Sequence, residues 1–314
     1  MYMQLINSLM EDDKLPYISV IITAYNRKEF LLNAIKSVLY QTLDKKYYEI
    51  IVIKNFRDEN IDCFINENKI KHIVMDGTVG EFLNKGISET NGEIISFLDD
   101  DDLFFPNKLD VIYNEFKRYN DVVYYHNNHI TMDERYQKLD SNLGKSIIFN
   151  LSSISIKKAI FNLNNLKKIN SNTDHFMYLL ALESNKVIMN SKQKLTYYMF
   201  HTSTSHVDTN DIDLFVKYRN VNLEEDIRSF IMFGEMFISR KAKNYIKQKI
   251  TNIEIDGYIL GESEKPKNPL NIFKDSDRPI SINLKIYLAY LLIRVHHNFR
   301  YIIIKKLLNN NKKS

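Results

Sequence analysis

Short apolar runs alternate with stretches of helical periodicity over residues 18–98, and this alternation restricts the folds that the chain can adopt. The run at 18–22 is β-branched and suits a buried strand, while residues 29–41 place apolar side chains at helical spacing. The pattern repeats with expected strands at 49–53, 70–74 and 93–98 and expected helices at 58–66 and 79–88. Strands that alternate with helices in this way form a mainly parallel sheet covered by helices on both faces. The sequence therefore predicts an α/β fold.

Four consecutive aspartates, residues 99–102, follow the expected strand at 93–98. Clustered carboxylates raise one another's pKa or require a cation, and hard oxygen ligands of this kind suit Mg²⁺ or Mn²⁺. A solvated acidic loop that caps the next helix, near residues 105–109, explains such a cluster equally well when it is considered alone. Ligands of parallel sheets bind beyond the carboxyl ends of the strands. We therefore expect residues 23–26 and the four aspartates to face one crevice.

Bulk composition restricts the class of protein. With 314 residues, of which 44% are hydrophobic, the chain can bury a globular core. The single cysteine, Cys63, excludes an internal disulfide and indicates a reducing compartment. The net charge of +4 is too small to indicate a nucleic-acid partner. Residues 1–15 do not resemble a secretory signal, and no apolar run approaches the roughly 20 residues that span a bilayer.

The second half of the chain follows a different pattern. After residues 122–125 the alternation stops, and the sequence to residue 166 is mixed and rich in asparagine. A helix is expected at 175–183, short strands at 186–189 and 194–200, and two or more helices over 211–248. Three of the five prolines fall between 266 and 279, which is typical of a linker. We therefore expect four parts, at 1–210, 211–260, 261–280 and 281–314.

Four segments together resemble the family 2 glycosyltransferases of the GT-A fold, over roughly residues 16–206. They are VIITAYNR at 20–27, AIKSVLYQT at 34–42, GEIISFLDDDD at 92–102 and PNKL at 106–109. The resemblance implies a Rossmann-like, mixed and mainly parallel sheet flanked by helices, here with a helical C-terminal extension. It also implies an inverting hexosyltransferase that moves a sugar from a nucleotide-diphosphate sugar to an acceptor hydroxyl, on a glycan or a lipid-linked acceptor.

The resemblance assigns roles to individual residues. It implies nucleotide contacts at Thr23, Tyr25, Asp99 and Asp100. It implies that Asp101 binds the Mn²⁺ or Mg²⁺ that bridges the two phosphates. Because four aspartates stand in a row, the register is open by one residue, and Asp102 is also a candidate metal ligand.

Two further residues match positions with a role in the family. Asp174 stands where the family has the general base, although Thr173 replaces the usual preceding glutamate. A carboxylate at the start of a helix can also be a simple cap. His201 ends an aromatic-rich segment, as the family's metal-site histidine does, and a neutral imidazole can complete a divalent-metal site.

Two departures concern recognition of the base. The family has Asp-Asp-Gly-Ser after its second strand, whereas this chain has Lys-Asn-Phe-Arg at 54–57. The side-chain oxygen of Asn55 can still accept a hydrogen bond from a base, so Asn55 is a candidate nucleotide contact. The family commonly has an arginine before the residue that corresponds to Asn84, and this chain has Leu83. These changes leave the identity of the donor base open.

Two other functions fit parts of the pattern. A non-catalytic protein that binds a nucleotide or a sugar would account for the altered residues at 54–57. A metal-dependent phosphatase or nucleotidyltransferase would also use an acid cluster at strand ends, but this sequence lacks a glycine-rich phosphate loop. We expect the acceptor surface to come from the Asn-rich stretches 125–128 and 150–155.

The C-terminal tail is basic and apolar. Residues 283–308 contain five lysines and arginines, and no acidic residue occurs from Ser281 onward. Its apolar runs are too short to span a bilayer but suit a helix that lies in an anionic membrane surface. A helix packed on the catalytic domain or in a homodimer interface fits the same residues. We expect a cytoplasmic enzyme whose tail contacts the cytoplasmic face of the membrane.

Overall fold

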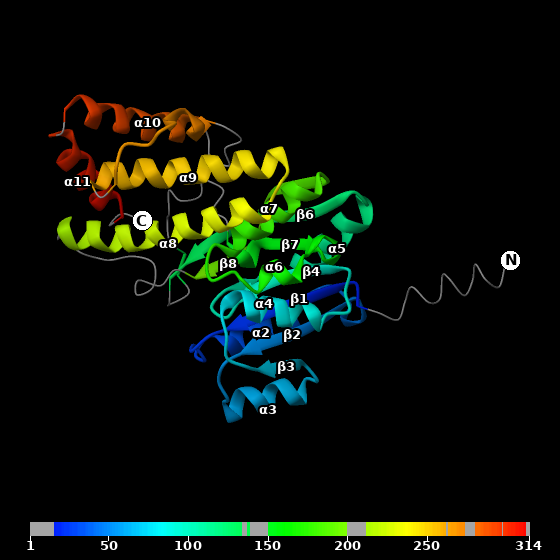
Figure 1. The fold of residues 1–314 in the computed structure, drawn as a ribbon. Coiled ribbons are helices and arrows are strands. Elements are labelled where there is room, and N and C mark those ends of the chain that lie inside the picture. The colour runs from blue at the N-terminus through cyan, green and yellow to red at the C-terminus, as the bar shows by residue number, and fades with distance from the viewer. Residues whose placement is uncertain are drawn as a thin grey trace. The chain divides into compact units, whose positions relative to one another are not determined.

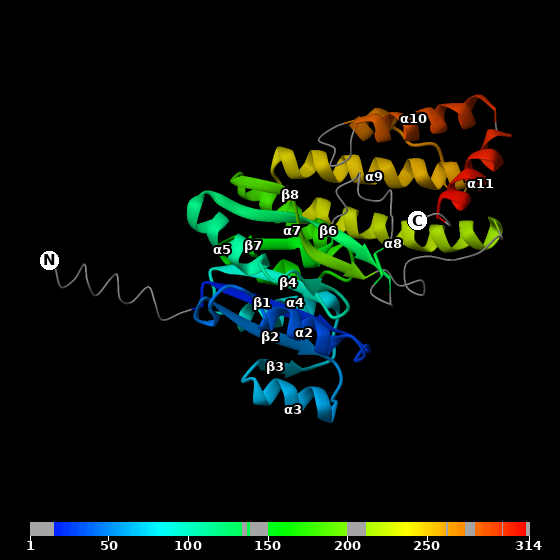
Figure 2. The same cartoon turned by 180° about the vertical axis from the view of Figure 1, so that it is seen from behind.

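The computed structural model describes residues 16–133, 137–138, 150–199, 212–261, 263–273, 280–296 and 298–311. The chain divides into two compact units. The first comprises residues 1–130 and 149–198, and the second comprises residues 131–148 and 199–314. Figures 1 and 2 show the elements of both units from opposite sides.

An eight-stranded sheet with the order β3-β2-β1-β4-β7-β6-β8-β5 forms the centre of the first unit. Its strands are β1 (Ile18–Ala24), β2 (Tyr48–Lys54), β3 (Lys71–Val74), β4 (Ile94–Asp99), β5 (Leu103–Phe104), β6 (Val122–Met132), β7 (Ile154–Lys157) and β8 (Val187–Met199). Its α-helices are α2 (Leu31–Leu39), α3 (Glu59–Glu67), α4 (Val79–Ser88), α5 (Lys108–Arg118), α6 (Leu163–Leu166) and α7 (Thr173–Ser184). Short 3₁₀ turns occupy Lys45–Tyr47, Leu151–Ser153 and Lys158–Ile160.

The strands β3, β2, β1 and β4 are parallel to one another. In β1, Thr23 pairs with Ile53 of β2 and with Asp99 of β4, so the carboxyl ends of these strands lie level with one another. The strands β1, β2 and β4 are buried on both faces, as their continuous apolar runs predict, whereas β3 at the edge of the sheet is partly exposed. The predicted mixed sheet flanked by helices is confirmed.

The other half of the sheet is antiparallel, through the pairs β4–β7, β6–β7 and β5–β8. Here the prediction of two short strands at 186–189 and 194–200 was wrong, because β8 runs without a break through the polar residues 190–194. Several of these polar residues are exposed to solvent. An antiparallel strand can have polar residues at solvent-facing positions, so they do not end the strand.

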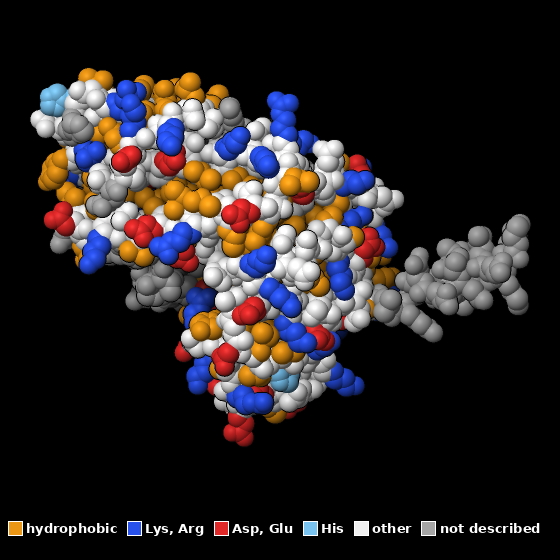
Figure 3. Space-filling view, in the orientation of Figure 1, with side chains coloured by type: hydrophobic (Ala, Val, Ile, Leu, Met, Phe, Trp, Pro, Cys, Tyr) orange, Lys and Arg blue, Asp and Glu red, His pale blue; other side chains and the backbone are white. Residues whose placement is uncertain are grey.

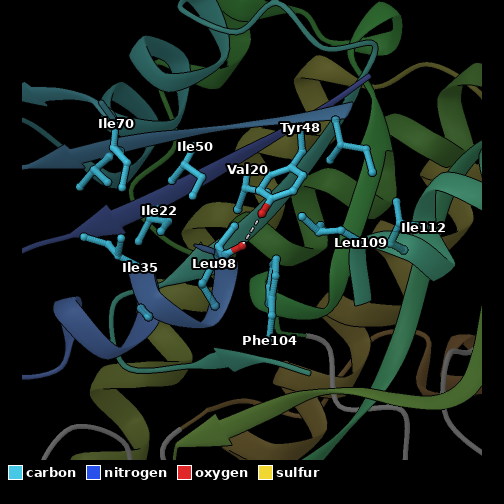
Figure 4. Close-up of a cluster of buried hydrophobic side chains, with 14 of the residues drawn as sticks. Val20, Ile22, Ile35, Tyr48, Ile50, Ile70, Leu98, Phe104, Leu109 and Ile112 are labelled. Atoms are coloured by element: carbon cyan, nitrogen blue, oxygen red, sulfur yellow. Dashed lines mark hydrogen bonds between the residues drawn. The ribbon is translucent and has the colours of Figure 1, made fainter. Parts of the chain in front are cut away.

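A cluster of buried side chains packs against the parallel half of the sheet (Figure 4). It joins Ile22 and Leu98 of the sheet to Ile35 of α2 and Leu109 of α5, all of which are inaccessible to solvent. The Tyr48 hydroxyl donates a hydrogen bond to the Val38 carbonyl at 3.0 Å, which satisfies its polar atom inside the cluster. Each fully buried side chain of this size stabilises the fold by about 1.5–3 kcal/mol.

The expected acceptor surface at 125–128 and 150–155 is buried instead. Asn127, Ser152 and Ser155 are inaccessible to solvent, and Asn150 is 7% exposed. These polar residues belong to β6, β7 and the turn before β7, where some of their polar atoms form hydrogen bonds inside the protein. For example, Asn127 donates to Thr196, and the hydroxyls of Ser96 and Ser155 lie 2.7 Å apart. The prediction was wrong because an Asn-rich sequence does not show that its amides have partners inside the protein.

The second unit is helical over its described residues from 212 onward. It contains α8 (Ile212–Met236), α9 (Arg240–Leu260), a 3₁₀ turn at Pro269–Phe273, α10 (Ile280–Val295) and α11 (Phe299–Asn311). One apolar cluster joins α9, the 3₁₀ turn and α10 through Ile255, Ile259, Ile272, Tyr290 and Ile293. The predicted helical C-terminal extension is confirmed, and part of the expected linker is packed, because Ile272 is fully buried. Among the described residues, no helix has the length and apolarity needed to cross a membrane.

Candidate functional site

A cavity of about 490 Å³ lies at the carboxyl ends of β1 and β4, in the first unit. Four of the predicted nucleotide contacts line it, namely Thr23, Tyr25, Asp99 and Asp100. Thr23 and Asp99 are brought together by the pairing of β1 with β4, although 76 positions of sequence separate them. The Tyr25 ring is 56% exposed and lies 6.0 Å from the ring of Phe82, so it presents an aromatic face to the cavity.

The start of α4 forms another wall of the cavity, through Gly77, Thr78 and Val79. The Thr78 side chain accepts from the Glu81 N–H, and the Glu81 carboxylate accepts from the Thr78 N–H, so a capping box fixes the first turn. Gly80 donates to the Ile169 carbonyl at 3.0 Å, and a Cβ there would lie only 2.3 Å from the Leu166 carbonyl oxygen. This close approach places the segment before α7 beside the cavity, where it contributes Asn170.

The four aspartates form a tight turn rather than a uniform acidic loop. The Asp102 N–H donates to the Asp99 carbonyl at 3.2 Å, and the Asp99 N–H donates to the Ser152 hydroxyl at 3.0 Å. Burial, together with the charges of Asp101 and Asp100, raises the pKa of Asp99 to about 7. Hydrogen bonds from the backbone N–H groups of Asp99 and Asp102 therefore hold the turn at both ends.

Arg27 connects the end of β1 to two members of the tetrad. Its Nη1 donates to Asp101 Oδ2 at 2.6 Å, and its Nη2 donates to Asp100 Oδ1. Burial lowers the pKa of Arg27, but the charges of Asp101 and Asp100 outweigh that effect and raise it. Sequence reasoning did not single out Arg27, although it lies within the matched segment at 20–27. The available signal was a basic residue at a strand end opposite clustered acids.

The carboxylates of Asp100 and Asp101 supply the kind of oxygen ligand that a hard cation prefers. One oxygen of each already contacts the Arg27 guanidinium. Within the described part of the chain, no group of three His, Cys, Asp or Glu side chains could hold a metal ion in this arrangement. His201, the other predicted ligand, lies outside the described residues.

Lys108 lies beneath the tetrad and is completely buried. Its ammonium donates to the Ser152 carbonyl and to the Thr196 hydroxyl, and it lies 3.9 Å from the centre of the Phe104 ring. Burial lowers its pKa well below the usual range, while the charge of Asp102 opposes that shift. Asp102, which is 1% exposed, is therefore within the electrostatic reach of Lys108. Lys108 belongs to the matched segment PNKL at 106–109, but the sequence did not predict a role for it.

Asp174 lies in the first turn of α7, after Asn172, whose backbone is left-handed with φ of 57°. Its Oδ1 accepts from the His175 N–H at 2.8 Å. The charge of Asp174 adds to burial in raising the pKa values of Asp99 and of the Tyr124 hydroxyl. Asp174 therefore belongs electrostatically to the same cluster as the tetrad, which lies more than 70 positions earlier in the sequence.

The two departures at the end of β2 have different structural consequences. Lys54 is fully buried, with its ammonium 2.6 Å from Asp62 Oδ1 and 2.7 Å from the Phe56 carbonyl oxygen. Asn55 makes reciprocal hydrogen bonds with Asn26, at 2.8 Å in both directions. Asn26 itself has a left-handed φ of 57°, so the pair stabilises the turn that leads from β1 to Arg27.

The α/β fold and the cavity with carboxylates at the strand ends agree with the class of enzyme expected from the sequence motifs, the transferases that use nucleotide sugars. The family model "Glycosyl transferase family 2" matches residues 19–183, which is more than half of the chain. The chain belongs to this glycosyltransferase family, as the sequence motifs predicted.

Individual relatives agree with that assignment, and a solved structure has a similar fold. An uncharacterised glycosyltransferase of Rickettsia bellii is 35% identical over 130 residues, which cover 40% of this chain and 18% of that protein. The poly(ribitol-phosphate) β-N-acetylglucosaminyltransferase TarP of Staphylococcus aureus is 25% identical over 226 residues, 69% of this chain and 63% of TarP. The chain thus spans less than two thirds of the length of these relatives. The crystal structure of S. aureus TarS 1–349 in complex with UDP-GlcNAc has a similar fold, with a TM-score of 0.53, 17% identity, and coverage of 81% of this chain and 78% of that one.

Proposed function

We propose that this glycosyltransferase is inverting and metal-dependent, and that it moves a sugar from a nucleotide-diphosphate donor to an acceptor hydroxyl. The observation that carries the proposal is the convergence of Asp100 and Asp101 on one cationic group beside the cavity, next to Asp99, whose pKa the charge of Asp174 helps to raise. A cation between carboxylates and a base near them are the two requirements of such a transfer.

Asp101 is the proposed metal ligand, together with His201. The Asp101 side chain is 12% exposed and lies beside the cavity. Asp102 is buried, and it is close enough to Lys108 to influence the pKa of that lysine. This difference supports Asp101, rather than Asp102, as the metal ligand. A bound Mn²⁺ or Mg²⁺ would supply positive charge against the departing diphosphate.

The donor nucleotide is proposed to lie against Thr23, Tyr25, Asp99 and Asp100. The hydroxyl group of Thr23 and the aromatic face of Tyr25 suit contacts with a ribose and a base. Asn55 retains a role in this proposal, because an amide has two donor hydrogens and two acceptor lone pairs, and Asn26 uses one of each.

Asp174 is the proposed general base. As the acceptor oxygen bonds to the anomeric carbon, its proton passes to the Asp174 carboxylate, and the bond from that carbon to the diphosphate oxygen breaks. This single displacement inverts the configuration at the anomeric carbon. Binding of donor and acceptor side by side supplies much of the rate enhancement.

A nucleotide screen tests the proposal. We expect one of UDP, GDP, CDP and dTDP to raise the melting temperature more with Mn²⁺ than without it, because a ligand that binds only the native state stabilises it by about 2.7 kcal/mol at a hundredfold excess over Kd. UDP-GlcNAc is the first donor to test, since the TarS structure contains it. A chain that no nucleoside diphosphate stabilises would contradict the proposal. Release of inorganic phosphate from these nucleotides would indicate a phosphatase instead.

The acceptor is proposed to be a glycan or a lipid-linked acceptor, presented at the cytoplasmic face of a membrane. The described helices α10 and α11 support a membrane contact. Ile280, Leu284, Leu288, Leu292 and Val295 lie three or four positions apart on α10, and each is at least 46% exposed. In Figure 3, apolar side chains gather along the upper edge over α10, with basic ones beside them. The division into parts at 210, 260 and 280 remains a proposal from the sequence, and α10 packs with α9 in one apolar cluster.

Liposome sedimentation tests the membrane contact. We expect the chain to sediment with vesicles of phosphatidylcholine and phosphatidylglycerol, because the apolar row inserts and each nearby basic residue adds about 1 kcal/mol. The double variant Leu284→Glu, Leu288→Glu should lose this binding. The control Val221→Glu, at a 60% exposed position of α8, should keep it. Equal sedimentation of all three proteins would refute the contact, and loss of a dimer in the double variant alone would identify the row as a homodimer interface.

A further inference from the structure

The Arg27 guanidinium is bound to the carboxylates of the proposed metal and nucleotide site. It bonds to Asp100 through one nitrogen and to Asp101 through another, and the same side chain lines the cavity. The two carboxylates that it contacts are a proposed nucleotide contact and the proposed metal ligand. A metal ion can therefore use the bonded oxygen of Asp101 only if the guanidinium leaves it.

The surroundings of Arg27 allow that movement. Its side chain is 36% exposed, whereas the Asp100 side chain is 1% exposed, so the guanidinium approaches the carboxylates from the solvent side. The backbone before it is held independently, because Asn26 is bonded to Asn55 in both directions. The arginine side chain can thus change partner while the turn that carries it stays in place.

The charges decide where the guanidinium would go. The tetrad needs a cation in the absence of donor, because its carboxylates repel one another. A donor diphosphate brings negative charge into the same cavity, and a guanidinium binds phosphate oxygens as well as it binds carboxylates.

We propose that Arg27 is an exchangeable counter-ion: it neutralises Asp100 and Asp101 in the donor-free enzyme and transfers to the donor diphosphate when a divalent cation takes its place. This inference rests on the proposed function. Its consequence is that the metal ion alone binds weakly, so that metal and donor load together.

Calorimetric titration of Mn²⁺ alone, without nucleotide, tests the proposal. We expect Arg27→Gln to bind Mn²⁺ at least about tenfold more tightly than the wild type, since the metal no longer displaces two charge-assisted hydrogen bonds. Lys28→Gln is the matched control, because it removes the same charge one position later, from a side chain that is 61% exposed and bonded to Asp58. The control corrects for the general loss of positive charge near the site.

A second titration uses inorganic pyrophosphate in EDTA, which presents the diphosphate charge without base or metal. We expect Arg27→Gln to weaken pyrophosphate binding relative to Lys28→Gln. Arg27→Lys, which keeps the charge but loses the two-nitrogen geometry, should fall between the wild type and Arg27→Gln in both titrations, and it replaces the glutamine variant if the latter does not fold.

The outcomes separate this inference from the function on which it rests. If the wild type binds a nucleoside diphosphate with Mn²⁺, but Arg27→Gln binds Mn²⁺ alone no more tightly than Lys28→Gln, then Arg27 is a fixed structural partner and the exchange is refuted. Unchanged pyrophosphate binding would refute it as well. If the wild type binds no nucleoside diphosphate at all, the proposed function and the exchange both fail.

Discussion

Asp101→Ala is expected to abolish turnover and the Mn²⁺-dependent part of nucleoside diphosphate binding together. Both losses follow from one cause, since the removed carboxylate is the proposed link between the metal ion and the phosphates. It also removes one of the two partners of the Arg27 guanidinium, whose bond to Asp101 Oδ2 is 2.6 Å long. Thermal shift with and without Mn²⁺ measures the binding, and a donor-turnover assay measures the activity.

The control for this variant is Asp121→Ala, at an exposed position before β6 whose backbone carbonyl, not its side chain, accepts from Val187. It should retain both binding and turnover. If Asp101→Ala still shows a Mn²⁺-dependent shift, then either the metal assignment is wrong or the metal ligand is Asp102.

Asp174→Asn is expected to lower kcat by at least about a hundredfold while nucleotide affinity stays near the wild-type value, because removal of a general base has effects of this size. The amide keeps the shape of the side chain and can still accept from the His175 N–H, so the start of α7 should be preserved. Steady-state kinetics and the nucleotide-induced thermal shift, measured on the same preparation, distinguish chemistry from binding.

Near-normal turnover by Asp174→Asn would leave Asp174 with a role in stabilising the start of α7 only. An equal loss of nucleotide affinity and of kcat would instead indicate that Asp174 contacts the donor. A reduced melting temperature without ligand would show that the substitution disturbs the helix, in which case kcat alone would not identify a base.

The parallel half of the sheet could be predicted from the sequence because its signals are local. The strands β1, β2 and β4 are short apolar runs separated by helical periodicity, and α4 was predicted at the residues where it occurs, Val79–Ser88. Burial on both faces requires continuous apolar residues, and the sequence shows them directly.

The antiparallel half was predicted less well, because its strands contain polar residues whose partners lie far away in sequence. Asn127 of β6 bonds to Thr196 of β8, and the Asp99 N–H bonds to Ser152. A strand of this kind has no continuous apolar run, so the buried residues at 150–155 resembled a polar surface. Only the pairing of β4 with β7 and of β6 with β7 shows that they are interior.

The sequence by itself determined the fold class, the family and the place of the acidic tetrad at a strand end, because each depends on local patterns: apolar runs, helical periodicity and short motifs in a fixed order. The tertiary structure decided how the tetrad is divided. It directs Asp100 and Asp101 to Arg27, from the end of β1, and it buries Asp102 within the electrostatic reach of Lys108, at the start of α5. Four identical residues in a row carry no information about which cation each one meets, since that depends on the turn between β4 and β5 and on Arg27, which lies more than 70 positions earlier in the sequence.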